Sequence, residues 1–150
     1  MDLHGFNIRV YGLLIDEGRI LVTDEFRMGM KMTKFPGGGL KYGEGTIDCL
    51  KRECREELGQ EIEVKEHFYT TDFFQPTKLL PIQMQLISIY YYISAVRPYR
   101  FKTSEKAFDF KELAEGAQSF RWISMDDIQD NDVTLPVDKK VVEFLKEKFV

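Results

Sequence analysis

The segment from Gly37 to Gly59 reads GGGLKYGEGTIDCLKRECREELG and ends with three closely spaced glutamates. Residues three or four positions apart share a face of an α-helix, so Glu53, Glu56 and Glu57 are expected on one stripe. Like charges placed in this way destabilise an isolated helix. One interpretation is an exposed acidic helix face, on which Arg52 pairs with Glu56. The other is that cations lie among the carboxylates.

The glycine-rich loop before this helix favours the second interpretation. Hard cations such as Mg²⁺ take oxygen ligands, and a sharply bent loop can add a backbone carbonyl to a set of carboxylates. Gly37, Gly38 and Gly39 allow the dihedral angles that such a bend needs, although they would also suit an ordinary tight turn. Loop and helix together predict a metal site that holds an anionic substrate such as a diphosphate.

The same segment resembles the Nudix box, G-x5-E-x7-R-E-U-x-E-E-x-G-U, in which U is a bulky apolar residue. The match spans residues 38–60, and seven fixed positions coincide by accident with a probability on the order of 10⁻⁸ per window. Two positions depart from the pattern, because Cys54 and Gln60 stand where apolar residues are usual. The seven matching residues are Gly38, Glu44, Arg52, Glu53, Glu56, Glu57 and Gly59.

The resemblance implies a role for most of these residues. Glu44 and Arg52 would brace the loop against the helix through a charge-assisted contact. The metal, Mg²⁺ or in some cases Mn²⁺, would be held by the carbonyl oxygen of Gly38 and the carboxylates of Glu53, Glu56 and Glu57.

The activity implied by the resemblance is hydrolysis of a pyrophosphate linkage in a small nucleotide. The metals would polarise the phosphates and lower the pKa of an attacking water molecule. The general base is left open. It is either Glu53 or Glu56 of the box, or an acid from the later loop, where exposure to solvent is the alternative role. The candidate glutamates of that loop are Glu105, Glu112 and Glu115.

Residues outside the box are candidates for binding the substrate. Arg27 and Lys34 precede the glycine loop and would meet substrate phosphates, unless they lie on a solvent-exposed strand edge. An aromatic group further on would either stack on a base or pack in the core. It consists of Phe68, Tyr69, Phe73 and Phe74.

The substrate class rests on weaker signals. Pro76 lies 16 positions after Gln60, a spacing similar to that of ADP-ribose-cleaving members of the family, although a turn between strands also explains it. A nucleoside diphosphate linked to a second group, such as ADP-ribose or a nucleotide sugar, is therefore placed ahead of a nucleoside triphosphate. The alternative function is a non-hydrolytic nucleotide-binding regulatory module, against which the complete set of metal carboxylates argues.

The elements that position the loop and helix follow from hydrophobic periodicity and turn residues. Thr46 is the expected N-cap of the helix and Gly59 its stop. Strands interleaved with two helices predict an α/β fold, a Nudix-type α/β/α sandwich with a mixed β-sheet. The predicted β regions are 6–26, with a hairpin turn at 16–19, then 61–74, 79–96 and 119–128; residues 27–39 and 97–119 are expected as loops and 136–150 as a helix.

Composition sets the remaining expectations. A chain of 150 residues suits a single domain over 1–150. The net charge of −4 argues against a nucleic-acid polymer as partner, and neither a leader nor a membrane span is expected. Cys49 and Cys54 are too far apart on one helix to be bridged, which indicates reduced thiols and a cytoplasmic location. The tyrosines at 90–92 leave at least one ring outward, at a candidate homodimer surface.

Overall fold

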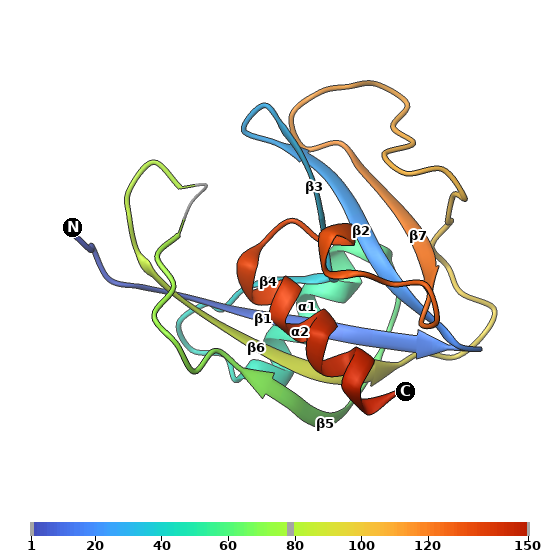
Figure 1. Ribbon diagram of the computed structural model, residues 1–150, viewed down its shortest axis with the longest axis horizontal. Coiled ribbons are helices and arrows are strands. Elements are labelled where there is room, and N and C mark those ends of the chain that lie inside the picture. Colours follow the sequence, from blue (N-terminus) through green and yellow to red (C-terminus); the bar gives the residue numbers. More distant parts are fainter. Residues whose placement is uncertain (1, 78–79, 150) are drawn as a thin grey trace.

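The computed structural model describes residues 2–77 and 80–149 (Figure 1). Within these residues the chain forms a seven-stranded mixed sheet in the order β3-β2-β1-β6-β5, with β4 paired to β1 and β7 to β2. The strands are β1 Phe6–Asp16, β2 Arg19–Arg27, β3 Met30–Lys34, β4 Gly37–Gly39, β5 Glu63–Thr70, β6 Gln85–Ser94 and β7 Gln118–Ser124. The helices are α1 Thr46–Leu58, the 3-10 turn η1 Asp130–Asp132 and α2 Pro136–Lys148.

The sheet divides into two halves that diverge from the β1–β2 hairpin (Figure 1). β1 pairs with β2 only at Ile15↔Ile20 and Asp16↔Arg19, whereas it pairs with β6 in parallel along nine residues, from Phe6↔Gln85 to Leu14↔Ile93. One half is therefore β4-β1-β6-β5 and the other is β3-β2-β7. This divergence places the two halves on either side of the cavity described below.

The two helices cover opposite faces of the sheet, which confirms the predicted α/β/α layers. Alternation along β1 sends Val10 and Leu14 to the face covered by α1, and Tyr11 and Leu13 to the face covered by α2. Each set packs into its own buried cluster with apolar residues of the helix on that side. Burial on both faces makes β1 the central support of the fold.

Helix α1 begins one residue earlier than expected and is rotated slightly about its axis. Gly45 is the N-cap, and the Thr46 hydroxyl instead forms a hydrogen bond of 2.7 Å with the Tyr91 hydroxyl. Cys49 is buried, whereas Ile47, which helical spacing would place on the same face as the buried Leu50, Cys54 and Leu58, is 45% exposed. Gly59 adopts the left-handed conformation and ends the helix as predicted.

Helix α2 matches its prediction except at the C-terminus. Val137, Val141, Val142 and Leu145 are buried against the sheet. Phe149, which a helix over 136–150 would place on that face, follows the last helical residue and is 49% exposed. The final residue of the predicted helix, at position 150, lies outside the described residues, as does position 79 at the start of a predicted β region.

The segment 27–39 contains two strands where a loop was expected. β3 pairs with β2 from Thr23↔Lys34 to Arg27↔Met30, and the glycines of β4 pair with Arg9, Val10 and Tyr11 of β1. Glycine has a low intrinsic preference for the strand conformation, so β4 forms because it pairs with β1. The later loop does lack regular structure over residues 97–117.

Candidate active site

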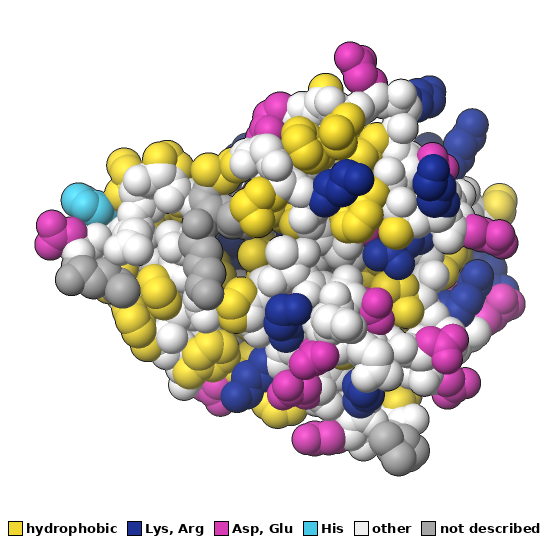
Figure 2. All heavy atoms as spheres, turned by 45° about the horizontal axis from the view of Figure 1, so that its top comes forward, with side chains coloured by type: hydrophobic (Ala, Val, Ile, Leu, Met, Phe, Trp, Pro, Cys, Tyr) yellow, Lys and Arg dark blue, Asp and Glu magenta, His cyan; other side chains and the backbone are white. Residues whose placement is uncertain are grey.

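A cavity of about 420 Å³ lies between the two halves of the sheet, and α1 and β4 form its base. In the space-filling view a hollow with a basic side chain at its base separates two lobes of the molecule, and apolar side chains line its rims (Figure 2). The apolar wall includes Met28, Met32, Leu86 and Leu135. The polar walls divide into a carboxylate side, supplied by α1, and a cationic side, supplied by the strands.

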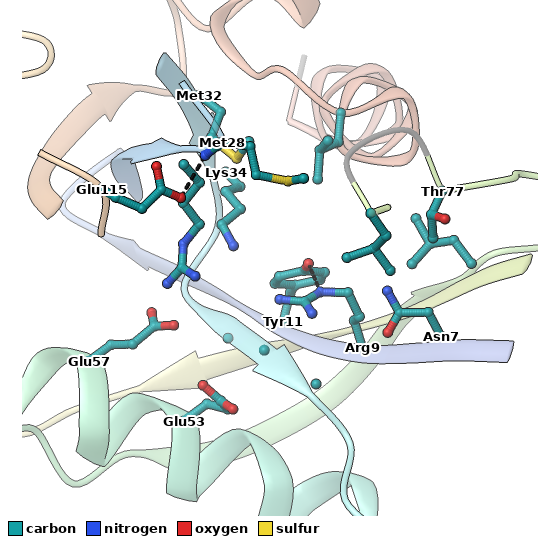
Figure 3. Close-up of a pocket in the computed structure, with 17 residues that line it drawn as sticks. Asn7, Arg9, Tyr11, Met28, Met32, Lys34, Glu53, Glu57, Thr77 and Glu115 are labelled. Carbon is teal, nitrogen blue, oxygen red and sulfur yellow. Dashed lines mark hydrogen bonds between the residues drawn. The ribbon is translucent and has the colours of Figure 1, made fainter. Parts of the chain in front are cut away.

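The carboxylate side begins where α1 touches the glycine loop. Glu53 packs directly on Gly38, because a Cβ atom built at Gly38 would lie 2.4 Å from the carboxyl carbon of Glu53. Any residue larger than glycine would push this carboxylate away. Glu53 and Glu57 line the cavity and point into it (Figure 3), whereas Glu56 is not among the lining residues and its side chain is 57% exposed.

Arg52 holds this side of the site together. Its guanidinium donates to Glu44 at 2.7 and 3.0 Å, to Glu53 at 2.9 Å and to Glu56 at 3.3 Å. It also donates to the carbonyl oxygen of Gly39 at 3.0 Å. Hydrogen bonds from Arg52, with one from the Lys41 backbone, lower the pKa of Glu44 to about 2. Arg52 with Glu44, Glu53 and Glu56 is called the Arg52 cluster below.

Glu57 has the environment of a metal ligand. One of its carboxylate oxygens is buried and has no hydrogen-bond partner among the described residues. Burial raises the pKa of Glu57 to about 8, although the Lys34 ammonium opposes the shift. A carboxylate in this position is stabilised by a cation, and the oxygen donors of Gly38, Glu53 and Glu57 suit a hard divalent ion.

Glu56, the third predicted carboxylate, is turned away from Glu53 and Glu57. Within the described residues, no group of three His, Cys, Asp or Glu side chains is close enough to hold a metal ion. The structure thus brings together Gly38, Glu53 and Glu57 and leaves Glu56 on the outer side of the helix, bonded to Arg52.

The cationic side contains both predicted substrate cations, and both pair with a buried acid. Glu25, in β2, is 1% exposed. Its two carboxylate oxygens lie 2.6 Å from Arg27 Nε and 3.2 Å from Lys34 Nζ. Lys34 is buried, which excludes the solvent-exposed strand edge for this residue, while Arg27 is exposed. Glu25 with Arg27 and Lys34 is called the Glu25 cluster below.

Three polar cavity residues on β1 were among those missed by sequence reasoning. Asn7, Arg9 and Tyr11 occupy alternate positions of β1 and all line the cavity. Arg9 donates its Nε–H to the Tyr11 hydroxyl at 2.6 Å, and its guanidinium carbon lies 5.6 Å from the centre of the Tyr11 ring (Figure 3). The available signal was the alternation of polar residues within an otherwise apolar central strand.

A second, more open cavity of about 690 Å³ lies beneath the later loop. Glu57 and Glu115 line both cavities. Glu115 accepts a hydrogen bond of 2.6 Å from the Met28 backbone N–H, whereas Glu112 lines the second cavity alone and Glu105 lines neither. Glu115 is thus the acid of this loop that reaches the first cavity.

The later loop is anchored by a buried ion pair. Asp24 in β2 is fully buried and accepts hydrogen bonds from Arg121 at 2.7 and 3.2 Å. It also accepts hydrogen bonds from the Thr33 hydroxyl, at 2.7 Å, and from the Phe108 backbone N–H, at 3.0 Å. This network fixes the loop against β2, β3 and β7.

The predicted aromatic group does not line either cavity. Phe68, Tyr69 and Phe73 pack against the buried cluster on the α2 face, which supports core packing for these three, and Phe74 is exposed. Of the three tyrosines at 90–92, Tyr90 is buried and its neighbours are partly buried. Tyr91 and Tyr92 make edge contacts with His67 and Phe68 on β5.

Neither α1 nor α2, the α-helices of the described residues, has the length and hydrophobicity of a membrane-spanning helix. A family model described as NUDIX domain matches residues 5–145. A search of curated proteins finds no match.

Several solved structures are similar to this chain. A MutT protein from Methanosarcina mazei Go1 aligns over 99% of both chains at 19% identity, with a TM-score of 0.70. An ADP-ribose pyrophosphatase from Streptococcus suis 89-1591 aligns over 95% of this chain and 91% of its own, at 14% identity and a TM-score of 0.62. A UDP-X diphosphatase aligns over 100% of this chain and 67% of its own, at 12% identity and a TM-score of 0.62. These likenesses establish the shared fold.

Proposed function

The chain belongs to the Nudix hydrolase family, and we propose that it cleaves the pyrophosphate linkage of a nucleoside diphosphate joined to a second group. The observation that carries this proposal is the convergence of Glu53, Glu57 and the glycine loop at the base of a cavity with a cationic wall. An acidic metal site opposite a cationic wall is suited to a diphosphate.

Gly38, Glu53 and Glu57 would hold the metal, which we propose to be Mg²⁺ with Mn²⁺ as a substitute; Glu56 would join them only after leaving Arg52. When bound, the ion would neutralise phosphate charge and lower the pKa of an attacking water molecule. Arg52 fixes Glu53 in place, and Glu44 in turn fixes Arg52. Arg27 and Lys34 are proposed to face the phosphates.

We propose two acids as candidates to take the proton of the water molecule. Glu53 reaches the cavity from α1, and Glu115 reaches it from the later loop. A general base must lie within hydrogen-bond reach of the water that it activates. Glu56 fits this role less well, because its carboxylate is exposed and bonded to Arg52.

The second cavity supports a linked substrate over a free triphosphate. Because the two cavities meet at Glu57 and Glu115, a diphosphate at the metal site could extend a nucleoside into one and its second group into the other. Phe101, Phe110 and Phe120 offer apolar surface there. Acids outnumber bases along this wall, which favours an uncharged group such as a sugar over another phosphorylated nucleoside. The charged lining residues are Glu57, Asp109, Glu112, Glu115, Lys102 and Lys111.

The location proposed for the protein is the cytoplasm. Cys49 and Cys54 are both buried and free, as expected in a compartment that keeps thiols reduced.

The test is a substrate panel with Mg²⁺, comprising ADP-ribose, nucleotide sugars, dinucleoside polyphosphates and nucleoside triphosphates. Products are separated, and phosphate is measured after coupled phosphatase treatment. We expect ADP-ribose or a nucleotide sugar to yield two monophosphates, with activity abolished by chelation. Pyrophosphate release from a triphosphate, with ADP-ribose left intact, would reverse the order of substrates. Nucleotide binding without hydrolysis of any compound would favour the regulatory module.

A further inference from the structure

The three cations that line the first cavity differ in how their charge is balanced. Arg27 and Lys34 lie within 3.2 Å of Glu25. Arg9 makes no ion pair within the described residues, although it is only partly exposed and stands on the central strand. The carboxylates of Glu53 and Glu25 act on the Arg9 guanidinium only from beyond ion-pair distance. A guanidinium that is withdrawn from water with no carboxylate in contact is costly, and an apolar side chain would serve packing better. The position of Arg9 therefore points to an anion that is supplied from outside the chain.

The contacts that Arg9 does make fix its direction. Its Nε–H donates to the Tyr11 hydroxyl, and the guanidinium lies against the Tyr11 ring with the cavity beside it (Figure 3). A Cβ atom built at Gly39 would lie 3.6 Å from Arg9 Nη1. Nη1 accordingly lies next to the glycine loop, and neither Nη group donates a hydrogen bond within residues 2–77 and 80–149.

We propose that Arg9 binds a phosphate group of the substrate through these two Nη groups, with Tyr11 holding the plane of the guanidinium. This inference rests on the proposed function, because the phosphate is assumed to lie beside Gly38 and Glu53. A guanidinium presents parallel N–H donors that match two phosphate oxygens, and one whose plane is already fixed loses less freedom on binding.

The comparison with the other two cations explains why Arg9 carries this role. A phosphate that approaches Arg27 or Lys34 competes with the carboxylate of Glu25 for the same N–H groups. Arg9 offers its two Nη groups without displacing an acid. We thus assign the main phosphate contact of the cationic side to Arg9. The cations of the Glu25 cluster would add a weaker, longer-range electrostatic attraction.

The test measures binding of ADP, inorganic pyrophosphate and adenosine by isothermal titration calorimetry with Mg²⁺ present. Arg9→Gln should weaken ADP and pyrophosphate binding by about 10- to 100-fold, which is the usual contribution of charged hydrogen bonds to affinity. It should leave adenosine binding unchanged. Arg9→Lys keeps the charge but not the planar pair of donors, so we expect an intermediate loss. In turnover, Arg9→Gln should raise KM more than it lowers kcat.

Arg19→Gln is the matched control. Arg19 also lies over an aromatic ring, at 5.0 Å from the centre of Trp122, but it lines neither cavity. Its substitution should leave all three affinities within about twofold of the wild type.

Each departure from this pattern overturns the inference. Wild-type ADP affinity in both Arg9 variants, no ADP binding by the wild type, or an equal loss for adenosine would do so; the last would assign Arg9 to the base. Because binding is measured without turnover, a hydrolase with an unaffected Arg9→Gln variant refutes this inference alone. A protein that binds ADP through Arg9 but hydrolyses nothing refutes the proposed activity alone.

Discussion

The two ion clusters that flank the cavity have opposite construction. In the Arg52 cluster one cation contacts three carboxylates, and its members lie within 13 positions of each other along the chain, on α1 and the loop before it. In the Glu25 cluster one buried carboxylate contacts two cations. Its members are brought together by the pairing of β2 with β3.

This difference indicates whether each cluster acts mainly on turnover or on stability. The Arg52 cluster is partly open to water, so its ion pairs contribute little to stability, and we propose that its main contribution is to catalysis. Glu25 and Lys34 of the Glu25 cluster are buried, and a charge left alone at either position would have little solvent to stabilise it. Damage to the first should therefore appear in turnover, and damage to the second in stability.

The largest expected effect is on turnover and separates two members of the Arg52 cluster. Glu53→Gln should lower kcat by about 1,000-fold or more, equivalent to about 4 kcal/mol, because Glu53 lines the cavity against Gly38. Glu56→Gln, which removes the other helical partner of Arg52, should lower kcat by about tenfold or less. Steady-state kinetics on the substrate identified by the panel, with circular dichroism to confirm folding, makes the comparison. Equal losses in the two variants would contradict the placement of Glu56 outside the site.

The next effect is on stability and concerns the Glu25 cluster. Glu25→Gln leaves the buried Lys34 ammonium without its partner and should lower the free energy of unfolding by about 3 kcal/mol. The double variant Glu25→Gln/Lys34→Met removes both charges and should recover part of this loss. Urea denaturation monitored by tryptophan fluorescence provides the measurement. A single variant as stable as the wild type would show that Glu25 does not neutralise Lys34.

The smallest effect concerns a buried acid that lacks an ion pair. Asp138 in α2 is fully buried and accepts a hydrogen bond from the Tyr90 hydroxyl, while its second oxygen has no partner among the described residues. Burial raises the pKa of Asp138 to about 6, against the charges of Lys34, Arg9 and Lys139. Since the folded pKa lies above the unfolded value, the stability contributed by the protonated acid is complete below about pH 4 and is lost as the pH rises through 6.

Asp138→Asn should therefore stabilise the protein at pH 7 by about 2 kcal/mol, with the advantage vanishing below about pH 4. Urea denaturation at pH 4, 5, 6 and 7 measures this dependence. Asp127→Asn, at an exposed position, is the control and should change the free energy of unfolding by less than about 0.5 kcal/mol. An advantage that is independent of pH would show that the gain comes from hydrogen bonding rather than from charge.

The sequence by itself determined the helix-borne half of the site. Helical spacing predicted that Glu53, Glu56 and Glu57 lie close together on α1, because neighbours on a helix are set by its pitch, and the family resemblance implied the contact between Glu44 and Arg52 that the structure contains. The same pitch explains why Glu56 lies outside the cavity. At 3.6 residues per turn, Glu57 stands about 40° from Glu53, whereas Glu56 stands about 60° away in the other direction, toward Arg52. That refinement was available from the sequence once the face turned to the cavity was known.

The tertiary structure alone decided the strand-borne half. Arg9 and Glu25 come from different strands, and their surroundings depend on the register of β1 with β4 and of β2 with β3. Alternation along β1 places Asn7, Arg9 and Tyr11 on one face. It does not show that this face borders a cavity. The cavity exists because β1 and β2 separate soon after their hairpin. Strand pairing is long-range, so the partners of a strand residue, and with them the balance of its charge, are fixed only when the whole sheet has formed.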